Sequence, residues 1–314
     1  MYEALVEYFE IPDVALKFIP LFLRRDEIAA LEKMGRSAYP PEKLAELLGG
    51  VTADPGRFIS DAYSRCVLSK VETPDGICFR AATFYDRLAY FTQFEPDVWK
   101  SVSAAQRAEI DGWYVRKYAD GARPRLENAL RDPSKLIENA FFFTLDETLK
   151  LIDDLEDDPY VVPCNCKTVA LNCADRKPNG VCVLFKKGVN SPWDRGHGRQ
   201  LTRKEAKELV KFANSKGLMQ TSEMEAAICN CCGCCCYPIR ASRMIGAKGL
   251  WPKKVYDVVW NQDRCVGCGK CAGICNFGAF RVEGREIVFD RDSCWSCTIC
   301  ANHCPVGAIT LERI

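Results

Sequence analysis

The sequence lacks an excess of charge of either sign, because 43 Lys and Arg residues stand against 42 Asp and Glu residues. A chain with this balance has no overall electrostatic attraction to nucleic acid or to a membrane surface. Long apolar runs are also missing, and the run from Phe18 to Leu23 is too short to span a bilayer. No secretory signal, no G-x-G-x-x-G motif and no G-x-x-x-x-G-K-[ST] motif is found. We therefore expect a soluble, cytoplasmic protein with no membrane span and no bound nucleotide cofactor.

Cysteine is scarce in one part of the chain and abundant in another. Residues 1–130 hold two of the 20 cysteines, Cys66 and Cys78, and the other 18 fall in tight groups after residue 163. Disulfide-dense proteins are small and secreted, which this chain of 314 residues is not. Grouped thiols in a reducing compartment instead indicate metal. Cys66 and Cys78 flank a hairpin turn and are expected to act as small buried apolar residues.

We expect an α+β protein with three regions. Residues 1–130 predict a helical, winged-helix-like domain: helices at Asp26–Met34, at PEKLAELL from Pro41 and at Arg57–Arg65 precede a hairpin centred on TPDG. Such a domain can bind DNA or dock a protein. Its 17 basic and 20 acidic residues lack the positive footprint that phosphate contacts require. Residues 131–256 form a cysteine-rich domain, and residues 257–314 form a third domain.

Two further helices follow from capping signals. Ser103 and Gln106 predict a helix that runs to about Tyr118. In the cysteine-rich region, Thr202 and Glu205 predict a helix that ends at Gly217. Its expected buried stripe consists of Leu209, Val210, Phe212 and Ala213. This helix would bring the cysteines on its two sides to one place.

Residues 257–314 contain an internal repeat with a period of 29 residues. Each copy reads C-x2-C-x2-C-x3-C, the run that bacterial ferredoxins with two [4Fe–4S] clusters use. The fourth cysteine of each copy begins a short helix that points across the repeat, so it is expected to bind the other cluster. One cluster would then use Cys265, Cys268, Cys271 and Cys304, and the other would use Cys294, Cys297, Cys300 and Cys275.

This region resembles the two-cluster bacterial ferredoxin domain, a resemblance that implies a βαββαβ fold. The alternative is a pair of zinc sites, although zinc ligands usually come as two separated C-x2-C pairs. One departure from the family pattern is Asn276, which replaces the proline expected after Cys275. The ligand should survive this change, while the local reduction potential shifts.

Ten more cysteines lie between residues 164 and 236. They are Cys164, Cys166, Cys173 and Cys182, followed by Cys229, Cys231, Cys232, Cys234, Cys235 and Cys236 in ICNCCGCCC. All ten are candidate ligands, and one or two further iron–sulfur clusters are expected here. The simplest division gives one site to the first four and another to four of the last six. Because adjacent cysteines such as Cys231 and Cys232 point in different directions, ligands could also mix between the groups. A zinc site or a redox-active thiol relay remains an alternative.

The order of PCNCK, the helix after Thr202 and ICNCCGCCC is similar to a family of multi-cluster iron–sulfur proteins from anaerobic prokaryotes with a C-terminal dicluster ferredoxin domain. That resemblance implies electron transfer with a partner reductase. Lys167 stands where the family usually has arginine, which keeps the charge but not the bidentate geometry.

Two histidines and an Arg–His–Arg segment complete the candidates. His197 and His303 could bind metal, but a hydrogen-bonding or surface role is expected for each. Arg195, His197 and Arg199 alternate with glycines and could surround an anion.

The leading functional hypothesis is an iron–sulfur electron-transfer protein or subunit. It would pass single electrons between a low-potential donor and a partner oxidoreductase through three or more clusters. The alternatives are a reductase with a catalytic cluster in the middle region and a redox-sensing regulator that binds DNA. We expect a redox partner protein and no nucleic-acid partner. The oligomeric state does not follow from the sequence.

Overall fold

A computed structural model describes residues 2–132, 134–135, 140–173, 176–222 and 226–314. The chain forms two compact units. The first comprises Met1–Tyr114, Thr168–Ala170 and Lys187–Gly198, and the second comprises Val115–Lys167, Leu171–Lys186 and Arg199–Ile314. Both contain helices and strands, which confirms the α+β class. None of the helices in the described ranges is long and apolar enough to cross a membrane. The division into three domains stays a prediction.

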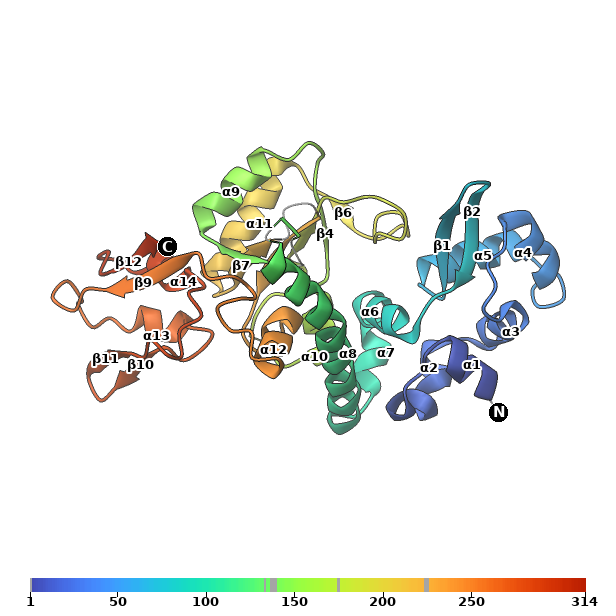
Figure 1. Cartoon of the computed structure of the whole chain (residues 1–314), viewed down its shortest axis with the longest axis horizontal. Helices are drawn as coiled ribbons and strands as arrows, with labels where there is room; N and C mark the ends of the chain where they lie inside the picture. Colours follow the sequence, from blue (N-terminus) through green and yellow to red (C-terminus); the bar gives the residue numbers. More distant parts are fainter. Residues whose placement is uncertain (1, 133, 136–139, 174–175, 223–225) are drawn as a thin grey trace. The chain divides into compact units, whose positions relative to one another are not determined.

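The first unit is mostly helical (Figure 1). Its elements are α1 (Glu3–Tyr8), the 3-10 helix η1 (Asp13–Phe18), α2 (Ile19–Phe22), α3 (Arg25–Met34), α4 (Pro41–Leu48), α5 (Pro55–Ser64), β1 (Leu68–Thr73), β2 (Gly76–Ala81), α6 (Phe84–Phe94) and α7 (Pro96–Ser101). Helices α3, α4 and α5 and the β1–β2 hairpin lie where the sequence predicts them. Tyr39 adds an isolated antiparallel bridge to Phe79 in β2.

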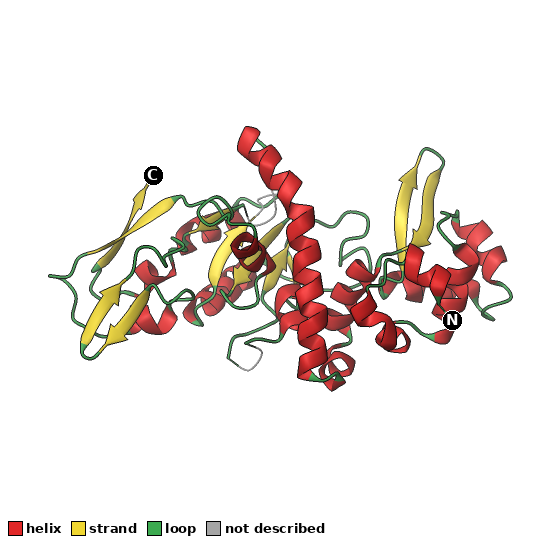
Figure 2. Ribbon diagram, turned by 60° about the horizontal axis from the view of Figure 1, so that its bottom comes forward, coloured by secondary structure: helices red, strands yellow, loops and turns green. Residues whose placement is uncertain are grey.

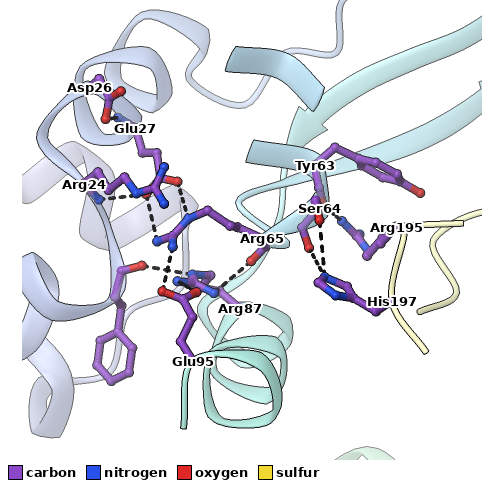
Figure 3. Close-up of polar contacts among 11 residues, drawn as sticks. Arg24, Asp26, Glu27, Tyr63, Ser64, Arg65, Arg87, Glu95, Arg195 and His197 are labelled. Atoms are coloured by element: carbon purple, nitrogen blue, oxygen red, sulfur yellow. Dashed lines mark hydrogen bonds and ion pairs between the residues drawn. The ribbon is translucent and has the colours of Figure 1, made fainter. Parts of the chain in front are cut away.

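Buried ion pairs connect the helices of this unit (Figure 3). Arg65 donates to Glu27 at 2.7 Å and to Glu95 at 2.6 Å, and Arg87 donates to Glu95 at 2.7 Å. The Arg87 side chain is fully buried and also donates to the backbone oxygen of Phe22. Loss of one partner would leave a buried charge unpaired, which is costly. We therefore assign this network to folding.

Arg195 lies against the β1–β2 hairpin and is buried. Its guanidinium donates to the backbone oxygens of Tyr63 and Leu68 and to the side chain of Asn190. In the second unit, the exposed Arg199 pairs with Glu205 at 3.3 Å. The prediction of an anion site is therefore wrong for Arg195, because acceptors of the protein occupy its guanidinium group. For Arg199 it stays a prediction.

His197 also has a structural role, as expected. Its Nε2 lies 2.8 Å from the backbone oxygen of Ser64, and its ring stacks on Phe94 with 3.8 Å between centroids. Cys66 is buried and Cys78 is half-buried. Cys66 precedes β1, and the residue of β1 opposite Cys78 is Val71. The two cysteines therefore do not face each other across the hairpin.

Helix α8 (Ala104–Arg131) extends beyond its predicted end at Tyr118, and Figure 2 shows it as one continuous helix. Pro124 lies inside it and removes one backbone donor. The helix continues because Ala119, Ala122 and Leu126 pack into a buried cluster with Trp251. Burial of this face outweighs the lost hydrogen bond.

The second unit contains a six-stranded antiparallel sheet. Its strands are β3 (Phe141–Phe143), β4 (Tyr160–Val162), β5 (Cys182–Leu184), β6 (Arg199–Gln200), β7 (Met219–Ser222) and β8 (Ala227–Cys231), in the order β3-β7-β8-β5-β4-β6. Helices α9 (Leu145–Asp153) and α11 (Arg203–Ser215) pack against β5 and β8 through a shared apolar core. The structure also contains α10 (Asn165–Ala170) and α12 (Tyr237–Met244).

Helix α11 is confirmed, with Thr202 as its N-cap and Glu205 in a reciprocal capping box. Gly217 follows it with a φ of +77°, a conformation that glycine adopts without strain. The predicted buried stripe is only partly right. Val210 is buried, but Phe212 is 47% exposed because it lies on the opposite face of the helix.

The C-terminal segment has the predicted βαββαβ order. Its elements are β9 (Tyr256–Trp260), α13 (Lys270–Ile274), β10 (Phe280–Glu283), β11 (Glu286–Phe289), α14 (Ile299–His303) and β12 (Ile309–Arg313). Strand β9 pairs with β12, and β10 pairs with β11, both antiparallel. The internal repeat of the sequence is thus a structural repeat.

Candidate metal centres

The first cysteine set of the C-terminal repeat combines both copies. Cys265, Cys268 and Cys271 line one small cavity together with Cys304 from the other end of the segment. Gly267 and Gly269 have φ angles of +67° and +71°, so the loop between these cysteines needs left-handed backbone at two positions.

The second set has the same loop with different residues. Ser296 and Thr298 hold the positions equivalent to the two glycines and adopt left-handed φ angles of +55° and +65°. The Ser296 N–H donates to the Sγ of Cys294 at 3.3 Å, and the Thr298 hydroxyl donates to the backbone of Phe143 at 3.0 Å. One contact within the loop and one outside it thus support a conformation that is costly for non-glycine residues.

Cys275 faces the second set. Burial raises the pKa of Cys300, and the nearby thiols of Cys297, Cys294 and Cys275 raise that pKa further. Cys275, Cys294 and Cys300 also pack in one apolar core. This placement agrees with the expected exchange of the fourth cysteine between the copies. Which thiols bind iron stays a prediction.

The ten cysteines of the middle region form two sets that differ from the simplest division. One cavity is lined by seven cysteines: Cys164, Cys166, Cys182, Cys229, Cys231, Cys232 and Cys236. We call these residues without Cys232 the six-cysteine set, because the Sγ of Cys232 lies within 3.6 Å of that of Cys173. A four-cysteine set consists of Cys173, Cys232, Cys234 and Cys235. The prediction that Cys173 shares a site with Cys164, Cys166 and Cys182 is therefore wrong. Cysteines of the two sequence groups lie together in both sets, the other arrangement that the sequence left open.

The sheet builds the six-cysteine set. Cys229 and Cys231 alternate along β8 and therefore point to one face of the strand. Val183 of β5 pairs with Ile228, which brings Cys182 opposite Cys229. The Sγ atoms of Cys231 and Cys236 lie 3.4 Å apart.

The N-terminal end of α12 completes this set. Cys236 directly precedes α12, and the Tyr237 N–H donates to the Sγ of Cys166 at 3.3 Å. Hydrogen bonds from Cys164 and then Cys236 lower the pKa of Cys166 to about 5. A thiol of this kind is ready to bind metal as the thiolate. The cavity that these residues line together with Cys232 measures about 30 Å³.

The four-cysteine set forms at a turn. Residues 233–235 follow β8 as a turn that directs Cys232, Cys234 and Cys235 toward Cys173. Cys231 and Cys232 both line the larger cavity, but their sulfurs have different neighbours, as expected for adjacent residues. The Sγ of Cys231 lies 3.4 Å from that of Cys236, and the Sγ of Cys232 lies 3.6 Å from that of Cys173. Cys234 and Cys235 do not follow that expectation, because the turn brings their Sγ atoms within 3.8 Å.

Lys167 is buried beside both sets. Its ammonium donates to the backbone oxygens of Pro178 at 2.9 Å and Asn230 at 3.1 Å. Burial by itself lowers the pKa of this lysine, but the surrounding thiols, Cys164 first among them, raise it overall. A permanent positive charge at this position offsets the negative charge of thiolates. Lys167 therefore keeps the positive charge of the arginine that usually stands at this position in the family that the sequence resembles.

Asn276 connects the C-terminal segment to the cysteine-rich region. Its side chain accepts from Lys177 at 2.6 Å and from the Gly233 N–H at 3.3 Å, and it donates to the Gly217 backbone at 2.9 Å. A proline could make none of these side-chain contacts, which explains the departure from the ferredoxin pattern. This role was missed in the sequence, because spacing does not show which distant residues approach one another.

One apolar core also joins these regions. It contains Cys231 and Cys236 of the six-cysteine set together with Trp295 and Cys297 of the second ferredoxin set. His303 lies outside it, and its Nε2 is 3.0 Å from the side-chain oxygen of Asn214. This confirms the expected hydrogen-bonding role for His303.

A family model described as a 4Fe-4S dicluster domain matches residues 258–311. No curated protein and no solved structure matches the chain. The family match and the two cysteine sets define an iron–sulfur protein whose C-terminal domain binds two [4Fe–4S] clusters. Cysteines of the middle region provide additional iron–sulfur sites.

Proposed function

We propose that this protein transfers single electrons between a partner oxidoreductase and a low-potential donor. The two ferredoxin clusters supply one-electron chemistry when bound, and the six-cysteine set extends their reach into the middle region. The apolar core that packs Cys231 and Cys236 together with Cys297 carries this proposal. A continuous, water-poor contact between two redox sites favours electron transfer from one to the other.

Exposure supports an orientation for the path. Cys268 of the first ferredoxin set is exposed, whereas Cys297 and Cys300 of the second set are buried. The first set therefore offers the edge for a redox partner, and the second set lies between it and the six-cysteine set. The electrons would move along the second unit of the chain.

Residues 25–81 support a docking role for the first unit. We propose that α3, α4, α5 and the β1–β2 hairpin form a winged-helix-like module that binds protein. The Tyr39–Phe79 bridge adds a third short strand segment to the hairpin, as such modules have. The excess of acidic over basic residues in 1–130 argues against duplex DNA.

Electron paramagnetic resonance of the full-length, anaerobically purified protein tests the electron path. Upon stepwise reduction, we expect signals from both ferredoxin clusters and a further paramagnetic centre whose relaxation they enhance. The double variant Cys229→Ser and Cys231→Ser should remove the further centre and retain the ferredoxin signals. The control is Cys78→Ser, which changes a thiol of the β1–β2 hairpin, outside all the cysteine sets. A middle region that stays diamagnetic at every potential would contradict the proposal.

A cavity of about 310 Å³ favours a second candidate function. Lys248, Lys254 and Arg291 line it together with Asp257, Asp292 and, from the second ferredoxin set, Cys294 and Trp295. Lys254 pairs with Asp257, so Lys248 and Arg291 carry the argument for an anion. A small anion bound there could receive electrons, so the protein would be a cluster-based reductase. Faster reoxidation of the reduced protein by a small anionic oxidant, lost in Arg291→Ala, would favour this function over electron transfer alone.

A further inference from the structure

The four-cysteine set differs in geometry from the other cysteine sets of the chain. Its Sγ–Sγ distances are 3.6 Å from Cys173 to Cys232 and 3.4 Å from Cys173 to Cys235. They are 3.5 Å from Cys232 to Cys234 and 3.8 Å from Cys234 to Cys235. All four sulfurs lie within 4.8 Å of one another.

These distances fit one tetrahedral ion. Thiolates bind zinc at about 2.3 Å, so the edge of a regular tetrathiolate tetrahedron is about 3.8 Å. In a [4Fe–4S] cluster each thiolate binds a different iron at a corner of a cube, which keeps the sulfurs farther apart. These separations leave room for one metal atom at the centre and none for a four-iron core.

The other sets provide an internal comparison. Within the described ranges, the four-cysteine set is the one group of three or more Cys, His, Asp or Glu ligand atoms that lie within 4.8 Å of one another. Neither ferredoxin set meets this criterion, although both belong to a matched dicluster domain. The six-cysteine set does not meet it either. The six-cysteine set contains one pair as close, Cys231 and Cys236 at 3.4 Å. Among the described residues, only the four-cysteine set brings all its sulfurs this close together.

We propose that Cys173, Cys232, Cys234 and Cys235 bind a single zinc ion. The set is closed, as structural zinc sites are, because Cys235, Cys232 and Cys173 are 0%, 1% and 3% exposed. Four protein thiolates leave no open coordination position for a substrate. Zinc is redox-inert, so this site lies outside the electron path, and the proposal does not depend on that path.

The position of the site in the chain gives it a function. Cys232 and Cys235 are direct neighbours of Cys231 and Cys236, which belong to the six-cysteine set. Asn172, next to Cys173, also donates from its side chain to the backbone oxygen of Cys234 at 2.9 Å. An ion that holds both ends of the turn would therefore fix two ligands of the neighbouring cluster site.

X-ray absorption at the zinc edge of the full-length, unmodified protein is the primary test. We expect about one zinc per chain, surrounded by four sulfurs at about 2.3 Å. A shell that contains nitrogen or oxygen, or a protein replete in iron but without zinc, would overturn the proposal. One iron in four thiolates at this position would also overturn it.

Single variants separate this site from the six-cysteine set. Cys173→Ser should weaken zinc binding by more than the roughly 10–100-fold that loss of an outer-shell partner costs, with little change in iron. Cys182→Ser should do the reverse, and Cys78→Ser should change neither metal. If Cys173→Ser removes several irons per chain and leaves zinc unchanged, the four-cysteine set belongs to a cluster. The absorption measurement on the unmodified protein decides the matter even if Cys173→Ser does not fold.

Discussion

The C-terminal repeat and the cysteine-rich region use similar numbers of thiols, eight and ten, in different ways. In the repeat, regular spacing places three cysteines of each set in one loop, and the other copy supplies the fourth. In the cysteine-rich region, the cysteines come from separate elements: β5, β8, the segments beside α10 and the turn before α12. A cluster site can therefore be read from local spacing where the ligands are local, and only from tertiary structure where they are not.

The largest expected effect tests the symmetry of the repeat. Cys275→Ala should destroy the cluster held by Cys294, Cys297 and Cys300 and remove about four of the eight ferredoxin irons. The reason is that Cys275 is the fourth thiol of that set. Iron analysis and electron paramagnetic resonance check the result, with Cys268→Ala as the counterpart for the other cluster. If Cys275→Ala instead removes the cluster of residues 265–271, each copy binds its own cluster and the comparison fails.

A smaller effect tests the contact between the two regions. A Cβ added at Gly233 would lie 2.5 Å from the backbone oxygen of Asn276, which cannot move as a side chain can. Gly233→Ala should therefore destabilise the second unit by about 1–3 kcal/mol, as overpacking does. Denaturant unfolding of the anaerobic protein measures this.

Gly273 provides the matched control, because no atom lies within 4 Å of its added Cβ and it sits within α13. Gly273→Ala should be neutral or slightly stabilising. Equal stability of both variants would show that the Gly233–Asn276 contact is not close in solution.

The side chain of Asn276 should contribute less. Asn276→Pro restores the usual ferredoxin residue but removes the hydrogen bonds to Lys177, Gly217 and Gly233, each worth about 0.5–1.5 kcal/mol. We expect lower stability and a shifted potential for the cluster that Cys275 serves. Asn276→Asp keeps an acceptor for Lys177 and should lose less. A proline variant as stable as the parent would mean that these hydrogen bonds contribute nothing.

The smallest effect lies in the first unit, which holds no candidate cluster ligand. Burial alone raises the pKa of Asp194, but hydrogen bonds from Lys70 and Tyr63 lower it overall. A carboxyl group with a lowered folded pKa stabilises the protein above its unfolded pKa, about 3.9, and this contribution is lost as the pH falls through the folded pKa.

Asp194→Asn should remove that pH-dependent contribution, by up to about 1 kcal/mol at neutral pH because the pair is partly exposed. Thermal unfolding followed as a function of pH measures it. Iron content should stay constant. Loss of iron in this variant would contradict the separation between a folding network in the first unit and metal sites in the second.

Local chemistry made much of the fold predictable. The capping box at Thr202 and Glu205, proline at the start of α4 and the TPDG turn all act within a few residues, so sequence shows them directly. The βαββαβ order follows from the repeat. Helix α8 continues beyond Pro124 because its C-terminal half packs against residues that are distant in the sequence, such as Trp251. A local sequence pattern does not show such contacts.

The same limit applies to the sites. Cys173 joins the turn at 232–235 because the chain after α10 returns to that turn, and no spacing rule encodes this return. In the sequence, the glycines beyond Arg195 suggested that its side chain could bind an anion. In the structure, the backbone oxygens of Tyr63 and Leu68 accept hydrogen bonds from its guanidinium instead. Tertiary contacts decided both cases.

Iron and acid-labile sulfide per chain, measured on the anaerobically purified full-length protein, test the central claim most directly. Two ferredoxin clusters account for about eight irons. The account predicts clearly more than eight, with the excess lost in the Cys229→Ser and Cys231→Ser double variant. A count that stays at about eight in both proteins would contradict it, because the electron path would then end at the C-terminal domain.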